Sequence, residues 1–87
     1  MDFVRGEVVC SRAGHDKGSF FTIVRIENGF AYIADGRGRS VLDPKKKNLL
    51  HLAQTKTVLS EQILRDDSTV RRALKGFMNS PETLTGR

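Results

Sequence analysis

Short runs of β-branched and aromatic residues, separated by turn-forming residues, fill the first part of this chain. Residues 6–12 and 20–26 are two such runs, and residues 30–34 form a third. Their length and composition are typical of β-strands. Asn28-Gly29 lies between the second and third runs, and both residues tolerate the positive φ that a tight hairpin turn needs. We therefore expect the second and third strands to form an antiparallel hairpin.

The pattern is less regular over the next twenty residues. We expect Val41-Leu42 to form a brief strand before Asp43-Pro44, and residues 48–53 to form another, although the periodicity of this last run fits a short helix almost as well. Several short strands joined by short turns predict a mainly β protein, a small antiparallel barrel of about five strands. Closure of the barrel would remove the exposed edges of a short open sheet.

A helical pattern replaces the strand pattern after residue 56. Ser60 is placed to cap a short helical turn, and Asp67 or Ser68 to cap a second helix. Apolar residues then recur three and four positions apart and form one stripe, which consists of Val70, Ala73, Leu74, Phe77 and Met78. A helix this short is unstable alone, so we expect its stripe to pack on the barrel.

Length and composition limit the class of protein. The 87 residues suffice for one domain, which we divide into a barrel over 1–56, a helical extension over 57–78 that packs on the barrel, and a flexible tail over 79–87. No apolar run approaches the ~20 residues that span a bilayer, and the first residues lack the plan of a signal peptide. A single cysteine cannot form an internal disulfide framework, so we expect a cytoplasmic protein without a membrane partner.

The positive charge is concentrated in one segment. The chain has 15 Lys and Arg residues against 10 Asp and Glu residues, a formal net charge of +5. Residues 36–56 hold six of the cations and one carboxylate, so this segment alone carries a net charge equal to that of the whole chain. A concentrated positive patch on a small protein favours nucleic acid or another anionic surface as its partner.

Two basic loops are candidate sites for phosphate contacts. In residues 12–18, glycines would let backbone amides approach phosphate while Arg12 and Lys17 supply charge; alternatively, Gly14 and Gly18 only allow positive φ in a solvated turn. The second loop combines two arginines with a run of three lysines, which would capture a nucleic-acid backbone. Alternatively, this second loop is only a solvated run of charges. Binding is favoured because its arginine cluster and its lysine cluster lie close together in the sequence, around one turn.

Phe20 and Phe21 are adjacent on an expected strand, so their side chains must point to opposite faces of the sheet. One of them should lie in the barrel core. The other would either stack on an RNA base or pack beneath the C-terminal helix, and packing is favoured because the apolar stripe of that helix needs a platform. Tyr32 has the same two alternatives.

Neither a catalytic nor a metal-binding pattern stands out in the sequence. Cys10 lies in an apolar strand without a cationic neighbour and is a poor nucleophile. Asp16 beside His15 is a contiguous pair rather than a placed catalytic dyad. The spacing of His15, His51 and Cys10 matches no closed zinc site. We therefore expect no enzymatic activity, no metal, no cofactor and no small-molecule substrate.

The glycine-punctuated start of the chain resembles a known motif. It reads Gly6-x-Val8-Val9, then Gly14-x-x-Lys17-Gly18, then Thr22-Ile23-Val24-x-Ile26, and is similar to the KOW motif of ribosomal and transcription-elongation proteins. Two later stretches narrow the resemblance: Ala34-Asp35-Gly36-Arg37 and Pro44-Lys45-Lys46-Lys47-Asn48-x-x-His51-Leu52. Over about residues 3–54, the chain looks like the bacterial KOW-domain proteins that are similar to the large-subunit ribosomal protein "L fourteen e" of archaea and eukaryotes.

This resemblance implies an SH3-like barrel that binds RNA, most of all ribosomal RNA, with the large ribosomal subunit as a further partner. Carried over by position, it implies one RNA contact at Arg12, His15 and Lys17 and a second at Arg37, Arg39, Lys45, Lys46 and Lys47. Many KOW motifs continue with Lys and Gly after the position of Gly18; this chain has Ser19 and Phe20 there, so one charge is missing. The alternative function is an SH3-like protein-interaction module with an acidic partner.

Overall fold

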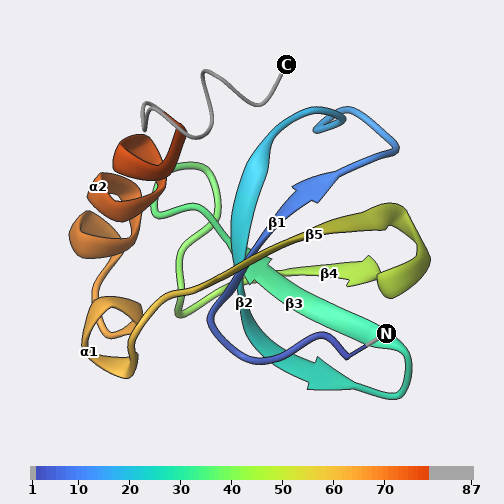
Figure 1. Cartoon of the computed structure of the whole chain (residues 1–87), viewed down its shortest axis with the longest axis horizontal. Helices are drawn as coiled ribbons and strands as arrows, with labels where there is room; N and C mark the ends of the chain where they lie inside the picture. Colours follow the sequence, from blue (N-terminus) through green and yellow to red (C-terminus); the bar gives the residue numbers. More distant parts are fainter. Residues whose placement is uncertain (1, 79–87) are drawn as a thin grey trace.

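The computed structural model describes residues 2–78 and shows a mainly β protein with helices at its C-terminal end (Figure 1). Its elements are β1 (Glu7–Ser11), β2 (Phe20–Glu27), β3 (Phe30–Ala34), β4 (Lys45–Asn48), a 3-10 turn (Leu49–His51), β5 (Leu52–Val58), α1 (Glu61–Leu64) and α2 (Asp67–Met78). The strands form one antiparallel sheet in the order β4-β3-β2-β1-β5. This arrangement is an SH3-like barrel, as expected. The expected flexible tail over 79–87 lies outside the described residues.

β1 lies between β2 and β5 in the sheet and is buried on both of its faces. Val8 and Val9 are neighbours, so they point to opposite sides of the sheet, and neither is exposed to solvent. Val9 belongs to the core inside the barrel, which consists of Val9, Phe21, Ile23, Ala31, Ile33 and Leu52. Val8 belongs to a second core, in which it meets Leu64, Val70 and Leu74 of the helices. The chain thus adds a second apolar layer to a barrel that is small by itself.

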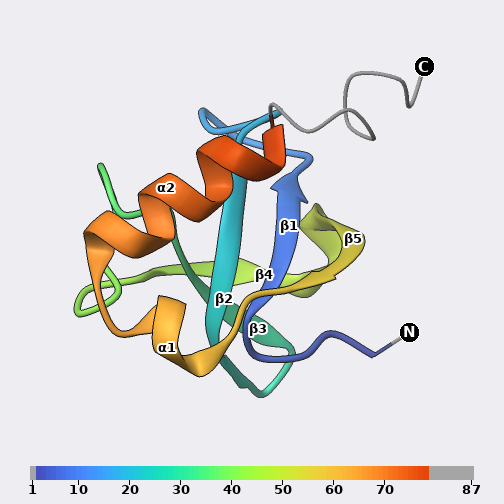
Figure 2. The same ribbon diagram turned by 60° about the vertical axis from the view of Figure 1, so that its left-hand side comes forward.

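The second core places α2 against the outer side of the sheet, where the helix lies across β2 (Figure 2). Phe20 points outward into this layer, and its ring meets that of Phe77 edge-on with 5.5 Å between the centroids. Phe21 points inward to the barrel core. The prediction that these two neighbours face opposite ways, with one beneath the helix, is therefore confirmed. In the described residues, no helix is both long and apolar enough to cross a membrane.

The turn signal and the cap of the first helix were predicted accurately, but the expected cap of the second helix was wrong, because Asp67 and Ser68 both lie within α2. Asn28 and Gly29 have φ values of 49° and 82°, as a tight turn between β2 and β3 requires. The Ser60 side chain accepts a hydrogen bond from the Ile63 backbone N–H and caps α1. α2 begins at Asp67, but the Asp67 carboxylate accepts the backbone N–H of Val41 at 2.8 Å instead of capping the helix.

Two expected strands differ from those in the structure. Val41-Leu42 forms a turn rather than a strand, and the Leu42 side chain is 91% exposed. The run 48–53 divides into two parts, because Asn48 caps the 3-10 turn with its side chain and extended backbone resumes only at Leu52. The lysine run, which we expected in a loop, is itself the strand β4. It pairs with β3, from Phe30 opposite Asn48 to Ile33 opposite Lys45.

Candidate nucleic-acid interface

The loop between β1 and β2 is held against β4 by the carboxylate of Asp16. Its Oδ2 atom lies 2.8 Å from Lys45 Nζ, and its Oδ1 atom lies 2.9 Å from Lys47 Nζ. The Ser11 hydroxyl also donates to Oδ1 at 2.7 Å. One acidic residue in the first basic loop therefore pairs with two lysines of the second candidate contact.

The alternation of side chains along β4 separates its three lysines. Lys45 and Lys47 face the first loop, whereas Lys46 between them points the other way. Lys47 is only 9% exposed and also donates to the carbonyl oxygen of Ala13 at 2.8 Å. The three lysines that we expected to form one contact therefore differ in their surroundings: Lys47 holds the loop, Lys45 is ion-paired and half-buried, and Lys46 lies on the surface.

The charge on Asp16 is strongly favoured by its partners. Desolvation by itself would raise the pKa of this carboxyl group. Together, the hydrogen bonds from Lys45, Lys47 and Ser11 outweigh this desolvation and hold the pKa of Asp16 far below its usual range. Asp16 is consequently ionised in the folded protein at every pH at which proteins normally work.

This low pKa predicts acid-sensitive stability. The folded protein holds Asp16 ionised at a pH where the unfolded chain already binds a proton, so the contribution of the ion pairs is complete at neutral pH and is lost as the pH falls below about 4. Urea unfolding between about pH 7 and pH 2 should show the stability advantage of the wild type over Asp16→Asn shrinking with acid. An advantage that stays constant over this range would contradict the assignment.

The remaining cations of the first loop project into solvent. Arg12, His15 and Lys17 are all exposed, on a turn in which Gly14 and Gly18 adopt φ values of 83° and 89°. The two glycines thus adopt the positive φ that a tight turn at these positions requires. The loop presents three cationic or titratable side chains while Asp16 on its inner side anchors it.

The loop between β3 and β4 is folded around the carboxylate of Asp35. Asp35 Oδ1 accepts the backbone N–H groups of Arg37 and Arg39 at 2.9 and 3.0 Å. Both arginine side chains are exposed as a result. Gly36 packs on α2, where its carbonyl oxygen accepts a hydrogen bond from the Arg71 guanidinium at 2.8 Å. This contact brings a cation of the helix beside the two arginines of the loop.

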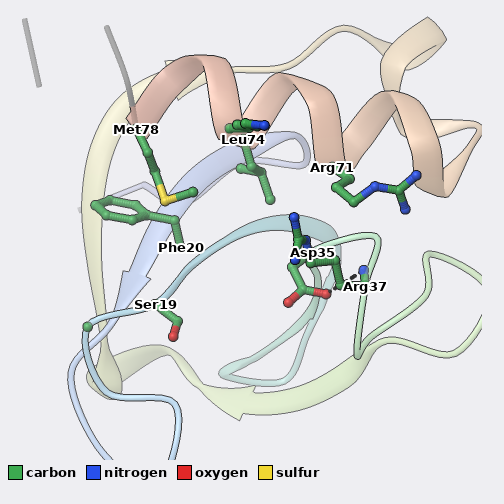
Figure 3. Close-up of a pocket in the computed structure, with 9 residues that line it drawn as sticks. Ser19, Phe20, Asp35, Arg37, Arg71, Leu74 and Met78 are labelled. Carbon is green, nitrogen blue, oxygen red and sulfur yellow. Dashed lines mark hydrogen bonds between the residues drawn. The ribbon is translucent and has the colours of Figure 1, made fainter.

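A cleft of about 570 Å³ lies where both loops meet α2 (Figure 3). Figure 3 shows Phe20 and Met78 together at one end, Arg71, Asp35 and Arg37 at the other, and Leu74 between them. Gly18 and Ser19, at the end of the first loop, also line it, as does Lys75 of α2. The structure therefore brings the end of the loop that carries Lys17 close to Arg37, although these residues are far apart in the sequence.

Sequence reasoning missed the share of α2 in this cleft. Arg71 and Lys75 lie four residues apart on the helix and both line the cleft. Their basic character was visible beside the apolar stripe. The sequence pattern did not show that the loop at Gly36 packs against the start of the helix. Because of this contact, Arg71 and Lys75 form one wall of the cleft.

The outer face of the sheet carries a second cationic group of side chains. The guanidinium of Arg25 lies over the Tyr32 ring, 4.0 Å from its centroid, and Lys46 Nζ lies 4.4 Å from the centroid of Phe30. Tyr32 is not among the residues of the second core beneath the helix, and one face of its ring is occupied by a cation of the same chain.

Comparisons with known proteins add no assignment to these observations. The resemblance to the KOW motif therefore rests on the sequence alone. The cleft and its cations are observations of the structure that do not depend on that resemblance. Searches against protein-family models and against curated proteins both find no match for this chain.

Proposed function

We propose that this chain is a non-catalytic RNA-binding protein that contacts RNA phosphates through its two loops and α2. The observation that carries the proposal is the gathering of Arg37, Arg71 and Lys75 around one cleft from two separate elements. A guanidinium group can donate two parallel hydrogen bonds to the oxygens of one phosphate. Each phosphate that a cation neutralises also releases counterions, which favours binding. The single carboxylate in that wall, Asp35, is already engaged by two backbone N–H groups.

The proposed contact residues follow from exposure and position. They are Arg12, His15 and Lys17 of the first loop, Arg37 and Arg39 of the second, and Arg71 and Lys75 of α2. Lys46 remains a candidate on the outer sheet face, Lys45 is reachable only in competition with Asp16, and Lys47 is left out because it is buried. Ribosomal RNA in the cytoplasm, within or beside the large subunit, is the most specific partner that the KOW resemblance supports.

The proposal predicts a localised loss of RNA affinity. Arg37→Glu with Lys75→Glu should weaken binding to a ribosomal RNA fragment by on the order of 10- to 100-fold and lower the salt slope by about one for each lost phosphate contact. Fluorescence anisotropy over a series of salt concentrations measures both quantities. Lys56→Glu with Arg72→Glu is the matched control, because it changes the net charge equally at exposed residues that do not line the cleft.

The outcomes separate this function from its alternative. Equal losses in the two double variants would show that only overall charge matters and would remove the cleft from the proposal. Absence of RNA binding by the wild type would overturn the proposal itself. A pull-down from extract with and without nuclease completes the test: acidic proteins that stay bound after nuclease treatment would favour the protein-interaction module.

A further inference from the structure

The two ends of the cleft differ in chemistry. One end is apolar: Leu74 is buried, Phe20 is half-buried, and Met78, drawn at the same end as Phe20 in Figure 3, is 40% exposed. The other end holds Arg37 and Arg71. A site with an apolar part and a cationic part suits a ligand that is itself flat and apolar at one end and anionic at the other.

We infer that this cleft receives one unpaired nucleotide of the bound RNA, with its base at the apolar end and its phosphate beside Arg71 and Lys75. The inference rests on the proposed RNA-binding function and names the kind of RNA feature that the site selects. Every base has an apolar π-face that can lie against Phe20, Leu74 or Met78. The helix supplies two cations to the cleft, whereas the loop supplies Arg37 together with the Asp35 carboxylate, so we place the anionic group on the side of the helix.

Size and access favour a single nucleotide over a paired one. A volume of about 570 Å³ lies within the range of small-ligand sites, which suits a single nucleotide. Sequence-specific recognition of RNA generally targets unpaired bases in bulges and loops, because these can leave the stack and enter a protein site.

The other aromatic side chains on the surface are poorer places for a base. Tyr32 and Phe30 lie on the outer sheet face, but Arg25 and Lys46 each cover one face of these rings. A base could stack there only by displacing a cation that the ring already attracts. In the cleft, the space beside the apolar side chains is open.

Three matched RNA duplexes test the inference: one fully paired, one with a single bulged nucleotide, and one with an abasic bulge. The wild type should bind the bulged duplex on the order of tenfold more tightly than either of the others. Met78→Ala should reduce this preference severalfold without changing the salt slope, because it removes base contact and no charge. Leu50→Ala is the control, since Leu50 is 83% exposed and does not line the cleft.

Each result has a distinct meaning. Equal affinity of the wild type for all three duplexes, with strong salt dependence, would overturn the inference and leave the proposed function standing. No binding to any of them, nor to a ribosomal RNA fragment, would overturn both. A preference for the bulge that Met78→Ala and Leu50→Ala reduce equally would also overturn the assignment to this cleft. Circular dichroism of both variants is the check that they retain the fold.

Discussion

Gly36→Ala is expected to destabilise the protein by about 3 kcal/mol, because it combines backbone strain with a steric clash. Gly36 has a φ of 76°, which side chains other than glycine rarely adopt. A Cβ atom at this position would overlap the Asp67 carbonyl oxygen and would lie 2.9 Å from the Arg71 backbone nitrogen. Both of these atoms belong to the backbone of α2, so relief requires the loop and the helix to separate. Urea unfolding monitored by circular dichroism measures the loss.

Gly38→Ala is the matched control for this prediction. Gly38 lies in the same loop and does not have a positive φ. A Cβ atom added there would have no neighbouring atom within 4 Å. This variant should unfold at close to the wild-type urea concentration. Gly36→Ala should also weaken RNA binding, since moving the loop breaks the bond from Arg71 to the Gly36 carbonyl and opens the cleft. Similar stability of the two variants would contradict the docking of the loop on α2.

Asp16→Ala is expected to destabilise the protein by about 2–3 kcal/mol, because Lys47 would be left nearly buried without a counterion. Lys45 would lose its partner too, and the Ser11 hydroxyl would keep only the Ala13 carbonyl as its acceptor. The first loop would then be attached to β4 mainly through the Ala13 carbonyl. Thermal and urea unfolding at neutral pH measure the effect, with Asp16→Asn as the variant that keeps the shape of the side chain.

Glu61→Ala provides the comparison with an exposed ion pair. Glu61 pairs with Arg5 at 2.8 Å, but the two side chains are 68% and 48% exposed. Water solvates both groups after the pair is broken, so the loss should be much smaller than that of Asp16→Ala. Equal losses in the two variants would show that burial does not set the strength of the Asp16 cluster.

Local patterns predicted much of the fold because their physical causes are local. The Asn28-Gly29 turn depends on the φ preferences of those two residues, and the opposite orientation of Phe20 and Phe21 depends on the pleat of one strand. The apolar stripe of α2 depends on helical periodicity. β4 was missed since a run of lysines has little β propensity, and its strand conformation is stabilised by pairing with β3 and by Asp16.

The candidate site was predicted only in part for the same reason. Exposed cations in the two loops could be named from the sequence, whereas the roles of Lys45 and Lys47 depend on a carboxylate 29 and 31 residues away. Arg71 and Lys75 became part of the cleft only through the docking of Gly36 on the helix.

The sequence by itself determined where the chain turns, which faces of its strands and helix are apolar, and where its positive charge is concentrated. The tertiary structure alone decided which cations are neutralised, which remain exposed, and which of them share one cleft. The physical reason is that the field at a charged group depends on every neighbour in space, and those neighbours are assembled by strand pairing and helix packing between residues distant in the chain.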